Sequence, residues 1–234
     1  MTETLSLRAK IEQSPMGAYQ WMIVVMAAIM NLLDGFDVLA LAFTATAIRG
    51  EFGLTGIELG YLLSAGLFGM TAGSLFLAPL ADKIGRRPLL LMAVSLSAIG
   101  MLGSAFISQY QWLGFWRVIT GLGVGGILVG TNVITSEYSS RKWRSFAISV
   151  YAAGFGIGAV LGGMFAVMLQ GEYGWRSVFL AGAILTGLLL VVLFIWLPES
   201  IDFLTSKQPK NAEVRLNLIA KKIGLAGDWK LPAK

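Results

Sequence analysis

Long apolar stretches, separated by short polar or charged segments, occupy most of the chain. Each stretch is about as long as the roughly 20 residues that a helix needs to cross a hydrocarbon layer. Apolar residues follow one another without the period-two alternation of a barrel strand, which indicates helices, since lipid cannot satisfy exposed backbone groups. The pattern predicts an all-α integral membrane protein with six helices, at about residues 21–47, 59–80, 89–107, 112–136, 146–169 and 177–197.

The two ends of the chain have a different character. Residues 1–20 are polar, and the apolar run that follows is too long for a cleavable signal peptide, so we expect a retained first helix. Residues 21–200 form the predicted transmembrane domain. In the tail, residues 201–234, the spacing of Val214, Leu218, Ile219 and Ile223 predicts a short amphipathic helix at the membrane surface.

Composition supports the membrane assignment and narrows the chemistry. The chain is 56% hydrophobic and only 13% charged, which is too apolar for a soluble globule. It has no Cys and no His, which removes disulfides, thiol nucleophiles and the commonest zinc ligands, and leaves proton chemistry to carboxylates. No arrangement of nucleophile and base lies outside the membrane, so we expect neither an enzyme nor a bound cofactor or metal.

The positions of the cations explain the net charge of +5. Most of the 18 lysines and arginines fall before the first helix, in the second and fourth connections, and in the tail, whereas Arg49 and Arg176 lie on the other side. By the positive-inside rule, both termini are expected in the cytoplasm. This distribution favours a lipid bilayer over nucleic acid as the partner of the basic residues.

Two acidic residues, Asp34 and Asp37, lie within the first predicted helix and on one helical face. An ionised Asp at mid-bilayer costs about 3 kcal/mol even on a lenient scale. A structural pair, satisfied by buried hydroxyls or by Arg117, is one interpretation. The other places both carboxylates on a water-accessible cavity where they exchange protons, with Arg117 of the fourth helix at matching depth to bind an anion or relay charge. Snorkelling of Arg117 to the outer surface is the alternative.

Glycines recur at four-residue spacing in several predicted helices. Gly121-Leu-Gly123-Val-Gly125-Gly126 fits a dinucleotide-binding pattern, but that pattern requires a preceding strand, and this run lies inside an apolar helix. Small residues at this spacing allow membrane helices to pack closely. We therefore expect helix packing contacts at a set of five glycines: Gly121, Gly125, Gly154, Gly158 and Gly162.

The second connection, Asp82-Lys83-Ile84-Gly85-Arg86-Arg87, closely resembles the signature loop of the major facilitator superfamily, with Ala78 where the family usually has Gly. Gly85 permits a tight turn, and we expect Asp82 and Arg86 to form a charge network that latches neighbouring cytoplasmic helix ends in one conformation. The resemblance implies a gating role for Asp82, Gly85, Arg86 and Arg87. Glu137 and Arg144 are expected as latch partners of Arg86 and Asp82.

Within that superfamily, Asp34-Gly35-Phe36-Asp37 is similar to the first-helix motif of aromatic acid:proton symporters. Arg117 with Gly121 and Gly125 looks like the fourth-helix motif implicated in proton coupling. In the fifth helix, Ala159 stands where antiporters typically have Pro, which fits a symporter better. The resemblance implies proton-driven uptake of benzoate-like and hydroxybenzoate-like anions across the cytoplasmic (inner) membrane, with the proton gradient as driving force. Asp34, Asp37 and Arg117 would couple proton to substrate.

Members of that family have twelve helices, and this chain matches only the N-terminal six-helix half, made of two three-helix repeats. A second half or another copy is therefore expected to complete the pathway. A disrupted reading frame would leave a membrane fragment without transport. A different solute, such as a sugar, dicarboxylate or drug, is the other alternative.

Overall fold

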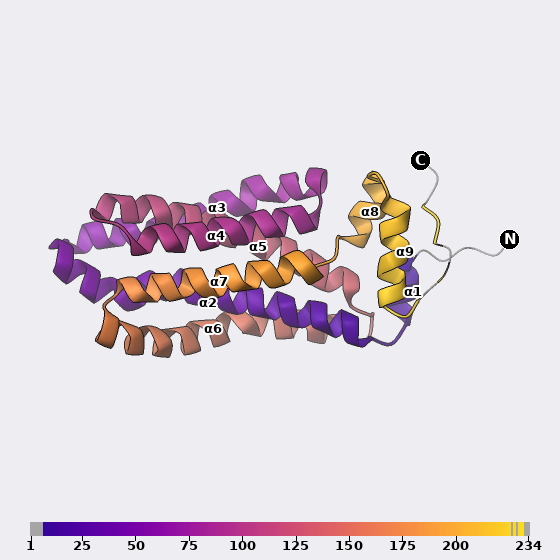
Figure 1. Ribbon diagram of the computed structural model, residues 1–234, viewed down its shortest axis with the longest axis horizontal. Helices are drawn as coiled ribbons and strands as arrows, with labels where there is room; N and C mark the ends of the chain where they lie inside the picture. The colour runs from indigo at the N-terminus through magenta and orange to yellow at the C-terminus, as the bar shows by residue number, and fades with distance from the viewer. Residues whose placement is uncertain (1–6, 226, 228, 232–234) are drawn as a thin grey trace.

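The computed structural model describes residues 7–225, 227 and 229–231, and these residues form helices joined by short connections (Figure 1). The helices are α1 Leu7–Gln13, α2 Ala18–Phe52, α3 Gly56–Ile84, α4 Arg86–Ala105, α5 Tyr110–Tyr138, α6 Arg144–Tyr173, α7 Arg176–Trp196, α8 Ile201–Lys207 and α9 Ala212–Lys222. Six of them, α2 to α7, are long and apolar enough to cross a membrane.

Each predicted transmembrane range falls on one of these six helices, but most of the helices are longer than predicted. The first range was 21–47, whereas α2 runs from Ala18 to Phe52. Hydropathy marks the part of a helix that contacts lipid, while the helix itself continues until a cap ends it. Gly53, with φ of 64°, ends α2, and Thr55 and Glu58 begin α3 through reciprocal side-chain to main-chain hydrogen bonds.

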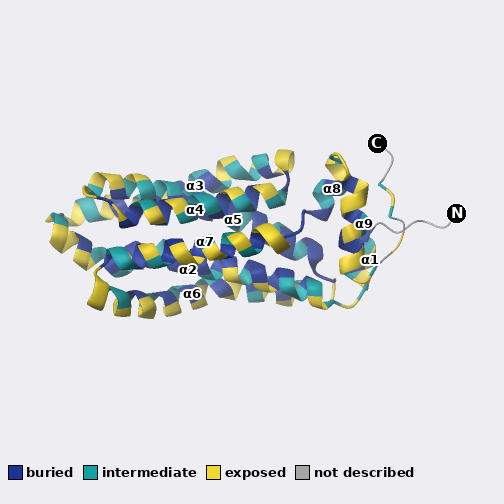
Figure 2. Ribbon diagram, viewed as in Figure 1, coloured by how far each residue is buried: buried dark blue, intermediate teal, exposed yellow. Residues whose placement is uncertain are grey.

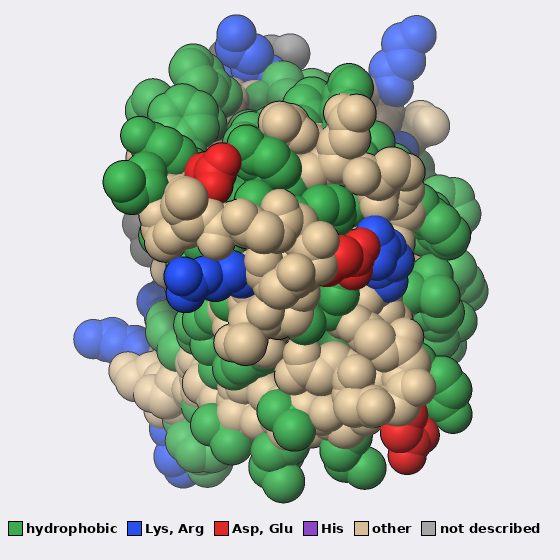
Figure 3. Space-filling model, turned by 90° about the vertical axis from the view of Figure 1, so that its left-hand side faces the viewer, with side chains coloured by type: hydrophobic (Ala, Val, Ile, Leu, Met, Phe, Trp, Pro, Cys, Tyr) green, Lys and Arg blue, Asp and Glu red, His purple; other side chains and the backbone are tan. Residues whose placement is uncertain are grey.

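The bundle has two distinct ends. α1, α8 and α9 pack together at one of them, which we call the terminal end, so the first and last helices of the described chain both lie there (Figure 1). The sequence predicted α9 but neither α1 nor α8. The opposite end, which we call the loop end, carries the connections α2–α3, α4–α5 and α6–α7, and its surface shows few charged side chains (Figure 3).

The long helices pack in pairs that repeat within the fold. α3 lies along α5, and α2 lies along α6, while α4 packs against both α5 and α7. Exchanging the first three long helices with the last three converts the α2–α6 pair into the α5–α3 pair, as expected for two three-helix repeats. Much of the surface of α3 and α6 stays exposed (Figure 2), including the large apolar residues Phe68, Phe76, Val160, Met164 and Met168.

The glycines at four-residue spacing lie where paired helices touch. A Cβ at Gly158 would overlap the carbonyl oxygen of Leu32, and one at Gly35 would overlap that of Phe155, so α2 and α6 meet backbone to backbone. The same holds between α3 and α5, where a Cβ at Gly121 would overlap the carbonyl oxygen of Gly66. Gly125 and Gly154 make the same backbone contact, with the carbonyl oxygens of Met70 and Ala28, whereas Gly162 makes room for the side chain of Phe36.

Candidate functional site

Asp34 and Asp37 lie midway along α2, where the helix is covered by its neighbours on several sides. Only 2% of Asp34 and 0% of Asp37 is exposed. The sequence-based interpretation placed both carboxylates on a water-accessible cavity, and in this conformation that expectation is wrong, because side chains of the neighbouring helices cover them. Two buried acidic groups one helical turn apart are costly unless neighbouring polar groups meet them.

The carboxylate of Asp37 is hydrogen-bonded to a side chain of α4. The hydroxyl of Ser97 donates a hydrogen bond to Oδ2 of Asp37 at 2.6 Å. The other carboxylate oxygen, Oδ1, is buried and has no hydrogen-bond partner among the described residues. Gly182 of α7 lies beside this oxygen, and a Cβ there would touch Oδ1 at 3.4 Å and overlap the side chain of Met101. Ser97 was not among the predicted site residues, because a serine inside an apolar helix carries no signal that distinguishes a functional partner.

Arg117 reaches the same place from α5 and is only 3% exposed, so it does not snorkel. Its Nη2 donates to the main-chain carbonyl of Asp37 at 2.6 Å, and its Nη1 lies 3.3 Å from the sulfur of Met101. Cζ stands 5.8 Å from the ring centroid of Phe179, and Nε is buried without a described partner. The predicted match in depth is observed, but the contact is to the backbone of Asp37 and not to its carboxylate.

Asp34 faces another part of the interior. Its Oδ2 is buried without a hydrogen-bond partner in the described part of the chain. One turn before it, the side-chain amide of Asn31 donates to the main-chain carbonyl of Tyr151 on α6 at 2.8 Å. The Tyr151 hydroxyl lies 3.4 Å from the hydroxyl of Thr131. Asn31, Tyr151 and Thr131 thus bring polar groups from α2, α6 and α5 into this region.

A small cavity lies beside Arg117, between α2, α3 and α5. Its volume is about 20 Å³, close to the space that one water molecule requires. Val38, Leu63, Gly66 and Gly121 line it together with Arg117. The guanidinium is therefore the charged group of this site that borders open space.

The signature loop forms a second polar centre, at the terminal end. Asp82 and Arg86 form an ion pair at 2.6 Å, as the sequence suggested for these two residues. Glu199, which follows α7, accepts hydrogen bonds through Oε1 from the main-chain N–H groups of Arg86 at 2.8 Å and Arg87 at 3.0 Å. It therefore caps the beginning of α4. Gly85 has φ of 103°, and a Cβ there would press against the Glu199 carboxylate.

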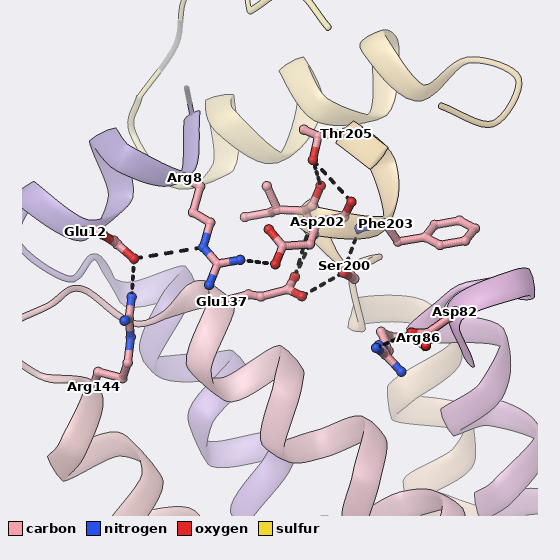
Figure 4. Close-up of polar contacts among 11 residues, drawn as sticks. Arg8, Glu12, Asp82, Arg86, Glu137, Arg144, Ser200, Asp202, Phe203 and Thr205 are labelled. Atoms are coloured by element: carbon pink, nitrogen blue, oxygen red, sulfur yellow. Dashed lines mark hydrogen bonds and ion pairs between the residues drawn. The ribbon is translucent and has the colours of Figure 1, made fainter. Parts of the chain in front are cut away.

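Glu137 and Arg144 have partners other than the expected ones (Figure 4). Glu137 accepts from the hydroxyl of Ser200 at 2.9 Å and from the N–H of Ile201 at 2.8 Å, at the start of α8. Arg144 donates to Glu12 of α1 at 2.6 Å. The expected direct contacts with Arg86 and Asp82 are wrong, because α1 and α8, which the sequence did not predict, supply closer partners. Arg86 acts on Glu137 only through its charge.

The same cluster joins α1 to the rest of the terminal end (Figure 4). Arg8 forms an ion pair with Asp202 of α8, and the main-chain carbonyl of Glu12 accepts from the N–H of Arg141 at 3.0 Å. The hydrogen bond from Arg144 lowers the pKa of the Glu12 carboxyl below its ordinary value. α1, α5, α6 and α8 are thereby connected through charged and polar side chains.

The fold and its buried charges define a multi-pass helical membrane protein with an ionisable centre, and comparison with known proteins gives the family. Residues 27–227 match the Major Facilitator Superfamily, and the chain belongs to it. The chain is 34% identical over 233 residues to the 4-hydroxybenzoate transporter PcaK of Pseudomonas putida, covering 98% of this chain and 52% of that protein. The gallate transporter of the same species is 36% identical, with 87% and 45% covered.

A third relative, the benzoate transport protein of Acinetobacter baylyi, is 26% identical, with 92% of this chain and 47% of that protein covered. Among solved structures, the proton:xylose symporter XylE superimposes with a TM-score of 0.78 at 22% identity, covering 90% of this chain and 50% of that one. The chain spans about half the length of the curated relatives it matches. Its six long helices form a half-length major facilitator fold.

Proposed function

We propose that this chain supplies half of a pathway that carries a small aromatic carboxylate into the cell together with protons. The substrate class is supported by its similarity to proteins named as 4-hydroxybenzoate, gallate and benzoate transporters. All three named solutes share one aromatic ring and one carboxylate. A pathway for them requires a cationic group for the carboxylate and a group that binds protons.

The observation that carries the proposal is the hydrogen bond from the buried Arg117 guanidinium to the main-chain carbonyl of Asp37. Within the described residues no carboxylate forms an ion pair with Arg117, so its charge stays available to an anionic substrate. The cavity beside it has room for about one water molecule in this conformation, so a substrate reaches the guanidinium when that space widens. A carbonyl holds a guanidinium more weakly than a carboxylate does. A substrate carboxylate would therefore displace the Asp37 carbonyl as the partner of Arg117.

Proton coupling is assigned to Asp34 and Asp37, each of which has one buried carboxylate oxygen without a described partner. The Ser97 hydroxyl beside Asp37 suits this role, because a hydroxyl donates to a carboxylate and accepts from a carboxylic acid. Both protonation states of Asp37 therefore keep a hydrogen bond. Arrival of the substrate anion at Arg117 would change the charge near Asp37 and so link proton binding to substrate binding.

The complete pathway requires a second six-helix body, and the exposed apolar side chains of α3 and α6 provide the surface for it. That body is either a further part of the same protein or a second copy of this chain. The terminal end is assigned to the cytoplasm, since the signature loop, the α5–α6 connection and the tail carry most of the cations. On this assignment the protein lies in the cytoplasmic membrane.

Uptake of radiolabelled 4-hydroxybenzoate tests the proposal in cells that lack uptake of their own. The chain is expressed alone and together with the last six helices of a 4-hydroxybenzoate transporter, with the Asp34→Asn, Asp37→Asn double variant as control. We expect uptake in at least one arrangement, inhibited by excess benzoate, unaffected by xylose, and abolished by a protonophore and by the double variant. Absence of uptake in both arrangements, or uptake that survives the double variant, overturns it.

A further inference from the structure

A cavity separate from the buried charges lies at the terminal end, where the end of α7 meets the start of α4 and one face of α9. Its volume is about 250 Å³. Arg87 of the signature loop lines it, together with Arg215 and Lys222 of α9. Arg215 and Lys222 are seven residues apart and so lie on the same face of that helix. Three cations from two segments distant in sequence thus surround one space.

The three cations of this cavity are not engaged in ion pairs with the described residues. Within the described residues, none of the three forms an ion pair with a carboxylate. Arg87 donates from Nη2 to the main-chain carbonyl of Phe194 at 2.6 Å, while its Nε is buried without a described partner. Lys222 places Nζ 5.3 Å from the ring centroid of Tyr19. The site is therefore electropositive and holds unused hydrogen-bond donors.

Glu199 is the carboxylate among the residues that line the cavity. Its Oε1 accepts from three main-chain N–H groups, those of Arg86, Arg87 and Ser200. These hydrogen bonds direct the carboxylate toward the beginning of α4. Glu199 thus serves α4 as a cap and leaves an excess of positive charge in the cavity.

The remaining wall is apolar and continuous with the side of α7 that faces outward. Ile195, Trp196 and Leu218 line the cavity and are themselves exposed. Ile184, Leu188, Val191 and Ile195 recur at helical spacing and form an exposed apolar row along α7 that ends at the cavity. A ligand that fits both parts has an anionic group at one end and long hydrocarbon chains at the other.

We propose that this cavity binds the phosphate headgroup of an anionic phospholipid, with its acyl chains along the exposed row of α7. Basic pockets at the ends of membrane helices recognise such headgroups through charge and hydrogen bonds. The bound lipid would connect α9 to the signature loop, because Arg215 and Lys222 belong to the first and Arg87 to the second. This inference depends on membrane insertion and does not rest on the proposed transport function.

Native mass spectrometry of the purified chain, titrated with phosphatidylglycerol or phosphatidylcholine, tests the proposal. The test variant is the Arg215→Gln, Lys222→Gln pair. The matched control is the Lys207→Gln, Lys210→Gln pair, which also removes two exposed tail cations but lies outside the cavity. At about 1 kcal/mol for each cation near the headgroup, we expect the test pair to weaken phosphatidylglycerol binding by at least about tenfold and the control pair by less than about twofold.

Several outcomes would overturn the proposal: equal binding of the two lipids, an equal loss in the control pair, or unchanged binding in the test pair. Inorganic phosphate and glycerol phosphate are added in a separate arm. If either displaces the lipid at equimolar concentration, the cavity is a site for a soluble phosphate and the lipid assignment is wrong. Circular dichroism at increasing temperature checks that the variants keep their fold. If the unfolding transition of the test pair is altered, the same titration is made with Lys222→Gln alone.

Discussion

The guanidinium of Arg117 donates a hydrogen bond to the main-chain carbonyl of Asp37, while the carboxylate of Asp37 accepts one from Ser97. Cation and anion thus lie on neighbouring helices at the same depth without forming an ion pair with each other. The guanidinium can exchange its carbonyl partner, and the carboxylate its hydroxyl partner, without the free-energy cost of separating an ion pair. This separation of the two charges is the basis of the first two predictions.

Arg117→Lys should reduce uptake of 4-hydroxybenzoate by at least about tenfold although the charge is kept. The planar guanidinium offers paired donors that match a carboxylate, and an ammonium group does not. Initial uptake rates measured over a range of substrate concentrations check this, with protein abundance in the membrane measured alongside. A Lys variant that transports as well as the wild type would show that only charge matters at this position.

Asp37→Asn should abolish accumulation against a gradient while preserving exchange of labelled for unlabelled substrate. The amide oxygen can still accept from Ser97, so the local packing is kept, but the side chain no longer binds a proton. Proteoliposomes loaded with unlabelled substrate distinguish exchange from accumulation. Loss of both activities together would assign Asp37 to substrate binding or to folding instead of to proton coupling.

Gly158→Ala should lower the free energy of unfolding by about 1–3 kcal/mol, since the new methyl group meets the carbonyl oxygen of Leu32 and forces the helices apart. Gly156→Ala is the matched control, because it lies on the same helix and a Cβ there meets nothing. Unfolding in detergent, followed by circular dichroism, measures both. We expect the control to be neutral or slightly stabilised, and equal effects in the two variants would contradict the packing role.

Glu199→Gln should loosen the first turn of α4. The carboxylate accepts from the N–H groups of Arg86 and Arg87, and replacing a charged acceptor with a neutral one weakens these bonds by about 1 kcal/mol. Hydrogen exchange in peptides that cover residues 84–89 should therefore become about fivefold faster. Glu213→Gln, at an exposed position in α9, provides the control and should leave these peptides unchanged.

The contact between Glu12 and Arg144 should make stability depend on pH. The folded state lowers the pKa of Glu12, so its contribution is fully present above the unfolded pKa of about 4.3 and is lost as pH falls through the lower folded pKa. Because 33% of the side chain is exposed, the effect should stay below about 1 kcal/mol. Thermal unfolding of wild type and Glu12→Gln should differ at pH 6 and converge at pH 3. A difference that stays constant with pH would rule out this contact as its source.

The sequence predicted the membrane helices and part of the buried site, for identifiable reasons. A run of apolar residues long enough to cross lipid has few alternative structures, so the positions of α2 to α7 follow from hydropathy. The similar depth of Asp37 and Arg117 follows from counting residues along two antiparallel helices. Ser97 could not be predicted in this way, because its role depends on how α4 is rotated about its own axis.

The terminal end was less predictable. α1 and α8 are helices of seven residues each, too short for a strong periodic signal, and buried contacts such as those of Leu7, Ile11 and Leu204 hold them in place. Without α1 and α8, the signature loop offered the nearest charged partners for Glu137 and Arg144. Once α1 and α8 are present, Glu12 and Ser200 are closer partners.

The backbone contacts at Gly35, Gly121 and Gly158 also limit how this half of the fold can move. Sliding α2 along α6 by one residue, or α3 along α5, would replace a glycine with a side chain opposite a carbonyl oxygen. These contacts therefore fix the axial register of α2 against α6 and of α3 against α5. A change of shape that keeps these contacts moves each pair as a rigid body, with bending confined to the segments between the pairs.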